Sequence, residues 1–302
     1  MQKLLEIWQL FSDSAKKLKK NRPMVLSAAT AFFTIFSIPP AIIITVNALS
    51  LYFKSENITA SLANNIAMLF GENVANQMNN IADNFSQMAS QPWITIAGSV
   101  FLVFVATNLF NVIKMSINQI WNIRHTPAKS TLLHELKKRG IALGIILLTS
   151  ILFILSAVAD SIITVLESIL PANFLSIDTL IILIVSKILA IIFVTLWFAA
   201  VFRFMPDARV PRKAIFTGAM VTSVLFITGK YILEELLINS NIDNIFETST
   251  SVVVIMLFIF YSSFIMYYGV CFTQVYTDYL DKSLKLRKNA RRVEIRTVKK
   301  SE

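Results

Sequence analysis

The chain alternates between long apolar stretches and shorter polar connections along most of its 302 residues. A helix needs about 20 mainly apolar residues to cross the hydrocarbon core of a bilayer. Because lipid offers the backbone no hydrogen-bond partners, such segments cross it as helices. The pattern predicts an all-α fold, a polytopic membrane bundle of six transmembrane helices. The predicted spans are Met24–Tyr52, Trp93–Ile113, Gly140–Thr164, Thr179–Phe202, Ala214–Leu233 and Val252–Tyr276.

Two segments outside these spans carry apolar residues at steps of three and four, which is the spacing of an amphipathic helix. Residues 55–92 are too polar to span and predict an amphipathic helical cap on the outer side. Residues 1–22 end in a run of lysines, which favours a helix lying in the cytoplasmic interface. The apolar positions are Ile58, Leu62, Ile66 and Phe70 in the outer segment and Leu4, Trp8, Phe11 and Leu18 in the N-terminal one.

Lys and Arg residues alternate strictly between connections. The N-terminal segment, the second and fourth connections and the C-terminal tail are basic, whereas the first, third and fifth connections contain Lys54 as their only basic residue. Connections rich in Lys and Arg stay in the cytoplasm, so both termini are predicted to be cytoplasmic. The predicted organisation is an interfacial helix at 1–22, a transmembrane domain at 23–277 and a basic tail at 278–302. We expect the tail to extend flexibly near anionic lipid headgroups.

Composition narrows the classes of function. Charged residues make up 15% of the chain, against about 25% in soluble proteins. One cysteine and two histidines exclude an intramolecular disulfide and leave little material for a metal site. The net charge of +10 is spread over loops, whereas a nucleic-acid-binding protein gathers its basic residues on one folded face. The sequence predicts no nucleic-acid partner, no cofactor and no enzymatic activity, and it favours anionic membrane lipids as partners.

Three motifs resemble a known family. Ser37-Ile38-Pro39-Pro40 lies within the first span, Asn118-Gln119-Ile120-Trp121-Asn122 follows the second, and the connection at 202–210 is followed by Gly218-Ala219. With the chain length and the six predicted spans, they resemble the YihY/virulence factor BrkB family of bacterial inner-membrane proteins along nearly the whole chain. The resemblance implies a multi-pass inner-membrane protein. It marks Arg203, Pro206 and Arg209 as part of a family-motif loop.

The chain also departs from that family. Glu247-Thr248-Ser249-Thr250 stands where the family often has a Tyr-Gly pair, and Gly269-Val270-Cys271 stands where it often has Gly-Ala-Glu. The missing carboxylate removes support for any function that would depend on it. A ribonuclease label attached to some members of the family is not supported either, because no loop carries the cluster of carboxylates or histidines that would hold a metal.

Ionisable residues inside predicted spans are costly and are therefore candidates for function. Asp160, Lys187, Lys230 and Glu234 all fall in the outer half of the predicted bilayer. We expect Lys187 to be neutralised by Asp160 across spans three and four. Lys230 and Glu234 are four residues apart, so they also fit an ordinary pair within one helix. Both interpretations remain open.

Two functions fit these features. The first is a transporter-like protein with an outward-facing polar cavity, lined by Asp160, Lys187 and Lys230, for a small-molecule or lipid ligand. The second is a structural or assembly protein of the envelope that binds lipids or partner proteins. Pro39 and Pro40 are predicted to kink the first span. Such a kink can mark a transport site, and it can equally serve helix packing.

Overall fold

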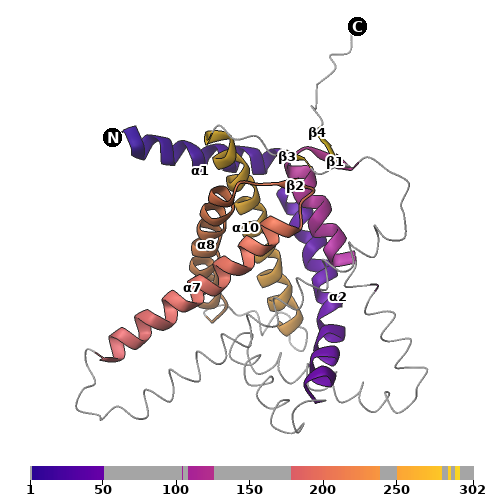
Figure 1. The fold of residues 1–302 in the computed structure, drawn as a ribbon. Helices are drawn as coiled ribbons and strands as arrows, with labels where there is room; N and C mark the ends of the chain where they lie inside the picture. The colour runs from indigo at the N-terminus through magenta and orange to yellow at the C-terminus, as the bar shows by residue number, and fades with distance from the viewer. Residues whose placement is uncertain are drawn as a thin grey trace. The chain divides into compact units, whose positions relative to one another are not determined.

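A computed structural model of the chain describes residues 2–50, 104, 108–125, 178–238, 250–280, 285–286 and 290–292. These residues are mainly helical, which confirms the predicted class (Figure 1). The helices are α1 (Gln2–Lys20), α2 (Pro23–Ser50), a helix at 108–120, α7 (Asp178–Phe204), α8 (Arg212–Ile238) and α10 (Thr250–Tyr279). The strands are β1 (Ile123–His125), β2 (Ala208–Arg209), β3 (Lys285–Leu286) and β4 (Ala290–Arg292). The predicted outer cap at 55–92 and the third span lie outside the described residues.

The chain forms two compact units. The first consists of Met1–Arg22, Lys114–Thr228 and Ile265–Glu302, and the second of Pro23–Ile113 and Gly229–Phe264. The first unit contains α1, all four strands, α7, most of α8 and the C-terminal part of α10. The contacts discussed below lie within this unit unless stated otherwise.

Two helices among the described residues are long and apolar enough to cross a membrane. They are Arg212–Leu233, with 22 residues, and Val253–Tyr279, with 27 residues. At about 1.5 Å per residue, both exceed the roughly 30 Å of a bilayer core. They match the predicted fifth and sixth spans. Shorter apolar helical segments, Pro23–Ser37 and Ile188–Phe204, fall where the first and fourth spans are predicted.

The exposed faces of α7 and α8 are apolar, and the buried face of α8 is mostly small or polar. Ile188, Ile192 and Leu196 follow one another at four-residue steps on α7 and are 43–50% exposed. On α8 the exposed stripe is Phe216, Met220 and Val224, while the buried face carries Ala214, Gly218, Ala219, Thr222 and Ser223. A helix on the surface of a water-soluble protein has the reverse polarity. Small and polar residues inside, with large apolar residues outside, are typical of helices that pack within lipid.

Helices α8 and α10 approach each other closely through a matched pair of glycines. A Cβ added at Gly218 would collide with the side chain of Thr273, and one added at Gly269 would collide with that of Thr222. Each glycine lies four residues before the threonine of its own helix, so the two contacts are reciprocal in an antiparallel pair. The threonines donate hydrogen bonds to their own helix, Thr222 Oγ1 to Gly218 O (2.6 Å) and Thr273 Oγ1 to Gly269 O (2.8 Å). The hydroxyls are thus satisfied without separating the helices.

Prolines set the connection between α7 and α8. Helix α7 ends at Phe204, two residues before Pro206, because a proline lacks a backbone donor and disfavours helical conformation in the residue before it. Helix α8 begins directly after Pro211, and Ile215 N donates to Pro211 O at 3.1 Å. Proline suits this position because its fixed φ matches the first turn and its missing N–H would have no partner there.

Helix α2, in the second unit, continues through the two prolines of the first motif. It is helical from Pro23 to Ser50, so Pro39 and Pro40 do not end it. The missing donors of these prolines leave the carbonyls four residues earlier without their usual partners. Just before them, Thr34 and Ser37 donate side-chain hydrogen bonds to the carbonyls of Thr30 and Thr34. Such bonds favour bending, and the kink itself stays a prediction.

Candidate functional site

The motif at 118–122 and the family-motif loop meet in a buried polar cluster. Asp207, from the connection between α7 and α8, is bound from two sides by the 108–120 helix. Lys114 Nζ lies 2.8 Å from Asp207 Oδ1, and Asn118 Nδ2 donates to Asp207 Oδ2 at 2.9 Å. The backbone N–H of Asp207 returns a bond to Asn118 Oδ1 at 3.0 Å. We call Lys114, Asn118 and Asp207 the latch.

The latch is largely shielded from solvent. The side chains of Asp207 and Lys114 are 9% and 15% exposed, and Asn118 is buried. Charges withdrawn from water are tolerated only when they are paired and hydrogen-bonded. Here both carboxylate oxygens and the backbone N–H of Asp207 have partners. An aspartate held in this way positions the connection that carries it, and its geometry is that of a structural tie between two segments 89 residues apart.

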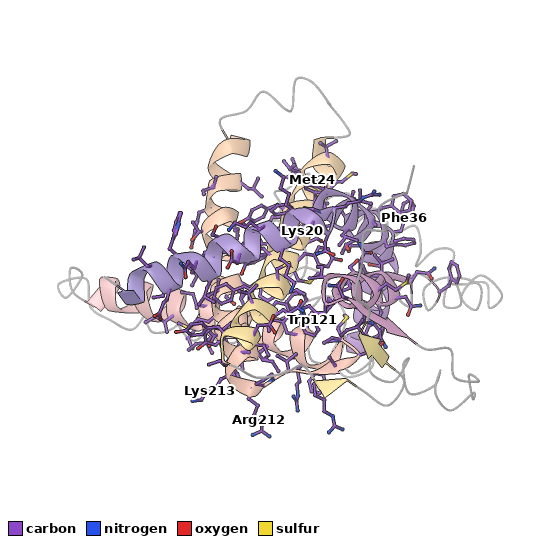
Figure 2. The ribbon with its side chains drawn as sticks, turned by 90° about the horizontal axis from the view of Figure 1, so that it is seen from above. Lys20, Met24, Phe36, Trp121, Arg212 and Lys213 are labelled. Atoms are coloured by element: carbon purple, nitrogen blue, oxygen red, sulfur yellow. The ribbon has the colours of Figure 1, made fainter. Side chains whose placement is uncertain are left out.

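Trp121 extends the latch to α10. Its side chain is fully buried, and its Nε1–H donates to the carbonyl oxygen of Val270 at 3.0 Å. Figure 2 shows Trp121 among the packed side chains of the unit. Asn122 follows with φ of 55°, the left-handed conformation that ends many helices and that asparagine tolerates well. The Asn118–Asn122 motif therefore ties α10 and the connection at 202–210 to the end of one helix.

Replacing Trp121 separates the hydrogen bond from the packing. We expect Trp121→Phe to cost about 1 kcal/mol, since it keeps most of the ring and removes one neutral hydrogen bond. Trp121→Ala should cost about 3–5 kcal/mol because it also leaves a cavity. Thermal unfolding of the detergent-purified chain measures both. Equal losses for the two variants would contradict a role for the ring in packing.

The residues of the family-motif loop divide into buried supports and an exposed charge. Arg203 is partly buried, and its Nη1 donates to the carbonyl oxygen of Val210 at 3.2 Å, which closes the loop on itself. Pro206 is buried. Arg209 is exposed and lies in β2. Arg203 and the latch thus hold the loop in place, and Arg209 is its exposed charge.

The C-terminal tail pairs with β1 and β2, so the expectation of a flexible extension is wrong for the strands it forms. β3 pairs antiparallel with β2, placing Lys285 opposite Arg209 and Leu286 opposite Ala208. β4 pairs antiparallel with β1, placing Ala290, Arg291 and Arg292 opposite His125, Arg124 and Ile123. Figure 1 shows the four strands gathered together. The basic composition suggested solvation, but the unpaired backbone of β1 and β2 offers a template for strand addition.

Helix α1 packs against the C-terminal part of α10. The rings of Phe11 and Phe272 lie 5.1 Å apart, and the hydroxyl of Tyr268 donates to Phe11 O at 3.1 Å. The hydroxyl of Tyr279 donates to Glu6 Oε2 at 2.8 Å. Helix α1 is present as its apolar spacing predicts. Trp8, predicted to lie on the apolar face that enters the membrane interface, is 72% exposed. Its location in a membrane interface stays a prediction.

Exposed basic side chains occur on several elements of the same unit. Figure 2 shows Arg212 and Lys213 projecting away from the packed side chains. Among the side chains that the structure describes, the exposed basic residues are Lys16, Lys19, Lys20, Arg22, Arg209, Arg212 and Lys213, and all belong to the first unit. In the described part of the second unit, the charged side chain is that of Lys230, which is partly buried.

The predicted cavity residues are only partly visible. Asp160 lies outside the described residues. Lys187 and Glu234 belong to α7 and α8, but their side chains lie outside the described part. The Asp160–Lys187 pair and the Lys230–Glu234 pair therefore stay predictions. Among the described residues, no three His, Cys, Asp or Glu side chains are grouped as metal ligands would be.

The sequence carries a signal for the latch that is independent of the predicted spans. Asp207 is the one acidic residue in the otherwise basic connection from Arg203 to Lys213. A lone acidic residue among basic ones is a candidate for an ion pair. Lys114 and Asn118 follow the second span and lie four residues apart, and thus on one helical face. What the pattern does not supply is which basic residue the acid meets.

Comparison with known proteins supports the family resemblance of the sequence. No solved structure matches the chain. The family model described as Virulence factor BrkB matches residues 14–294, a range that includes the latch, the motif loop and both tail strands. The chain therefore belongs to the virulence factor BrkB family of membrane proteins.

Proposed function

We propose that this chain is a multi-pass protein of the bacterial inner membrane that serves the envelope in a structural or assembly role. Its cytoplasmic face would hold anionic lipid headgroups, and both termini would lie on that side. The chain would carry out no enzymatic reaction. The observation that supports this best is the segregation of charge, since every exposed basic side chain among the described residues belongs to one compact unit.

Strand pairing supports the orientation independently of charge. Residues 123–125, 208–209, 285–286 and 290–292 are joined by backbone hydrogen bonds. Three segments that pair in this way must lie on the same side of a bilayer. They come from the second connection, the fourth connection and the tail, which are the segments that the alternation of Lys and Arg assigns to the cytoplasm.

The proposed cytoplasmic face suits lipid binding because its basic residues adjoin helices whose exposed side chains are apolar. Arg212 and Lys213 open α8, and Phe216, one turn later, is 53% exposed. Basic residues next to a membrane contribute about 1 kcal/mol each to attraction for anionic lipid. Lys19 and Lys20 end α1 in the same unit.

The test compares anionic and neutral lipid. Phosphatidylglycerol vesicles should raise the melting temperature of the reconstituted protein above its value in phosphatidylcholine. This difference should shrink with added salt, since salt screens exposed charges. Replacing Lys19, Lys20, Arg212 and Lys213 together by glutamine should remove most of it. As a control, Lys230→Gln removes one basic residue of the second unit and should leave the difference unchanged, whereas each of Lys19→Gln, Lys20→Gln, Arg212→Gln and Lys213→Gln alone should lower it. Equal melting temperatures of the unaltered protein in both lipids would refute the proposed function.

The transporter hypothesis stays as the alternative. One observation favours it: Gln274, on the buried face of α10, is 1% exposed and its Oε1 has no hydrogen-bond partner within the described structure. An unsatisfied buried polar atom needs an explanation such as a water or a ligand. The neighbouring hydroxyls of Thr273 and Thr277 are instead bonded to their own helix, which favours packing. The structural role therefore has the stronger support.

A further inference from the structure

Helix α1 has two apolar faces, of which one is packed and one is open. The packed face consists of Phe11, whose ring contacts α10, and of Ser14 and Leu18, which are 0% and 4% exposed. Leu5 and Trp8 are instead 60% and 72% exposed. With 3.6 residues per turn, they lie about a third of a turn round the helix from the packed face. The apolar spacing of α1 therefore covers two surfaces, and we call Leu5 and Trp8 the open face.

The contacts with α10 fix the level of α1 along that helix. The rings of Phe11 and Phe272 lie 5.1 Å apart, and the hydroxyl of Tyr268 donates to Phe11 O. Phe272 precedes Tyr276, the predicted end of the sixth span, by four residues, or about 6 Å along the axis. Figure 1 shows α1 crossing α10 near the C-terminal end of α10. Helix α1 therefore lies beside the last turns of an apolar helix that is long enough to span a bilayer.

A polar face adjoins the open face. Gln9, Asp13, Lys16 and Lys20 are exposed and follow one another at steps of four, three and four residues, so they form one line along α1. Lys16 and Asp13 form an ion pair at 3.0 Å on this line. A face with bulky apolar side chains next to a face that carries lysines is the pattern of a helix lying in the plane of a membrane interface.

Resting on the membrane location in the proposed function, we propose that α1 is an in-plane anchor whose open face inserts between the lipids of the cytoplasmic leaflet, where headgroups meet acyl chains. An apolar surface beside the last turns of a spanning helix meets lipid wherever protein does not cover it, and Leu5 and Trp8 are uncovered. Tryptophan also favours this depth, because its ring is apolar and its N–H can bond to headgroups.

This contact differs in kind from the attraction of basic residues for anionic headgroups. Burial of Leu5 and Trp8 depends on apolar area and not on lipid charge, so the insertion should occur in neutral lipid. The lysines of the adjoining polar face would add an electrostatic part in anionic lipid. Because Tyr279 bonds to Glu6 and Phe272 packs on Phe11, the anchor would hold the C-terminal part of α10 at a fixed depth.

The test follows the fluorescence of Trp8 in vesicles of phosphatidylcholine that carries bromine on its acyl chains, since bromine quenches tryptophan on contact. The chain has four tryptophans, so the contribution of Trp8 is the difference between the unaltered protein and Trp8→Phe. The matched control combines Trp8→Phe with Asp13→Trp, which moves the indole to the polar face. This control breaks only an exposed ion pair, whose loss costs little stability.

We expect bromine near the headgroup end of the acyl chains to remove most of the Trp8 contribution. Bromine near the methyl end should remove less, because interfacial helices lie about 5–10 Å deep. In the control, the indole at position 13 should be quenched mainly by aqueous iodide.

Three results would overturn the anchor. Quenching of Trp8 by iodide and not by bromine would show that the open face lies in water. Protection of Trp8 from both quenchers would assign the face to a protein surface such as a second copy of the chain. Equal bromine quenching at positions 8 and 13 would mean that α1 has no separate lipid-facing side. If the control variant does not fold, the Trp8 difference alone decides between lipid, water and protein.

The anchor and the proposed function can fail separately. Replacing Lys19, Lys20, Arg212 and Lys213 by glutamine should leave bromine quenching of Trp8 in phosphatidylcholine largely intact. If bromine quenches Trp8 while the melting temperatures in phosphatidylglycerol and phosphatidylcholine are equal, the anchor stands and the proposed function fails. If the melting temperatures differ and bromine does not quench Trp8, the anchor fails and the proposed function stands.

Discussion

Asp207→Ala should destabilise the protein by about 3–5 kcal/mol, the cost of leaving one member of a buried ion pair without its partner. In this variant Lys114 Nζ loses its carboxylate at 2.8 Å, and the Asn118 amide loses both the oxygen and the ordered backbone that it binds. Because β2 begins directly after Asp207, the pairing of β2 with β3 should weaken as well. Thermal denaturation of purified protein gives the stability, and amide exchange at 208–209 gives the pairing.

A double-mutant cycle separates the ion pair from the general effect of mutation. Lys114→Met alone leaves the carboxylate buried, and Asp207→Asn alone leaves the ammonium buried. Combined, they remove both charges and keep similar volumes, so the loss for the double variant should be well below the sum of the single losses. The control is Asp278→Asn, which changes an exposed acid of the same unit and should have little effect. Additive losses in the cycle would show that the pair does not form.

Gly269→Val should have the second large effect, because it places three carbon atoms where two helices already touch. A single Cβ at Gly269 would collide with Thr222 Oγ1, and it would lie 2.9 Å from Thr222 Cβ and 3.0 Å from Phe202 Cζ. Overpacking in a core usually costs about 1–3 kcal/mol and sometimes more. We expect a loss at or above the top of that range, since the obstacles come from α8 and α7 together.

A compensating change tests the geometry of this contact. Gly269→Ala should be milder than Gly269→Val, and adding Thr222→Ala should recover part of its loss by removing the nearest atom. Thr222→Ala alone should cost little, because its hydroxyl bonds only within α8, to Gly218 O. The matched site is Gly218, whose Cβ would meet Thr273. There, Thr222→Ala should give no rescue of Gly218→Ala. Rescue at both glycines would mean that the relief is not local.

The family departure at Gly269-Val270-Cys271 acquires a physical meaning in the structure. The glycine is retained where the contact between α8 and α10 requires it, and Val270 supplies the carbonyl that binds Trp121. Cys271, standing where the family often has a carboxylate, is buried. This part of α10 therefore serves packing in this chain, and it lacks the carboxylate of the family pattern where Cys271 stands.

The sequence by itself determined the helices and the surface they present. A run of apolar residues long enough to cross a bilayer must satisfy its own backbone, and it does so by local hydrogen bonds whatever its neighbours are. For this reason α8 and α10 lie where the fifth and sixth spans are predicted, and α1 lies where the amphipathic spacing places it. Pro206 and Pro211 likewise set the limits of α7 and α8 through their own covalent geometry.

Only the tertiary structure decided which polar groups meet. The sequence offers Asp207 several basic residues as partners. It contacts Lys114 and Asn118 because of how the 108–120 helix is rotated against the loop that carries Asp207, 89 residues after Asn118. Trp121 donates to the backbone carbonyl of Val270, 149 residues away. The side chain of Val270 gives no indication of this hydrogen bond. The tail strands pair with backbone groups of β1 and β2, and which strand each of them meets depends on where the fold places β1 and β2. Contacts of this kind follow from packing. The chemistry of a side chain determines which type of partner it can bind, and the fold determines which residue supplies that partner.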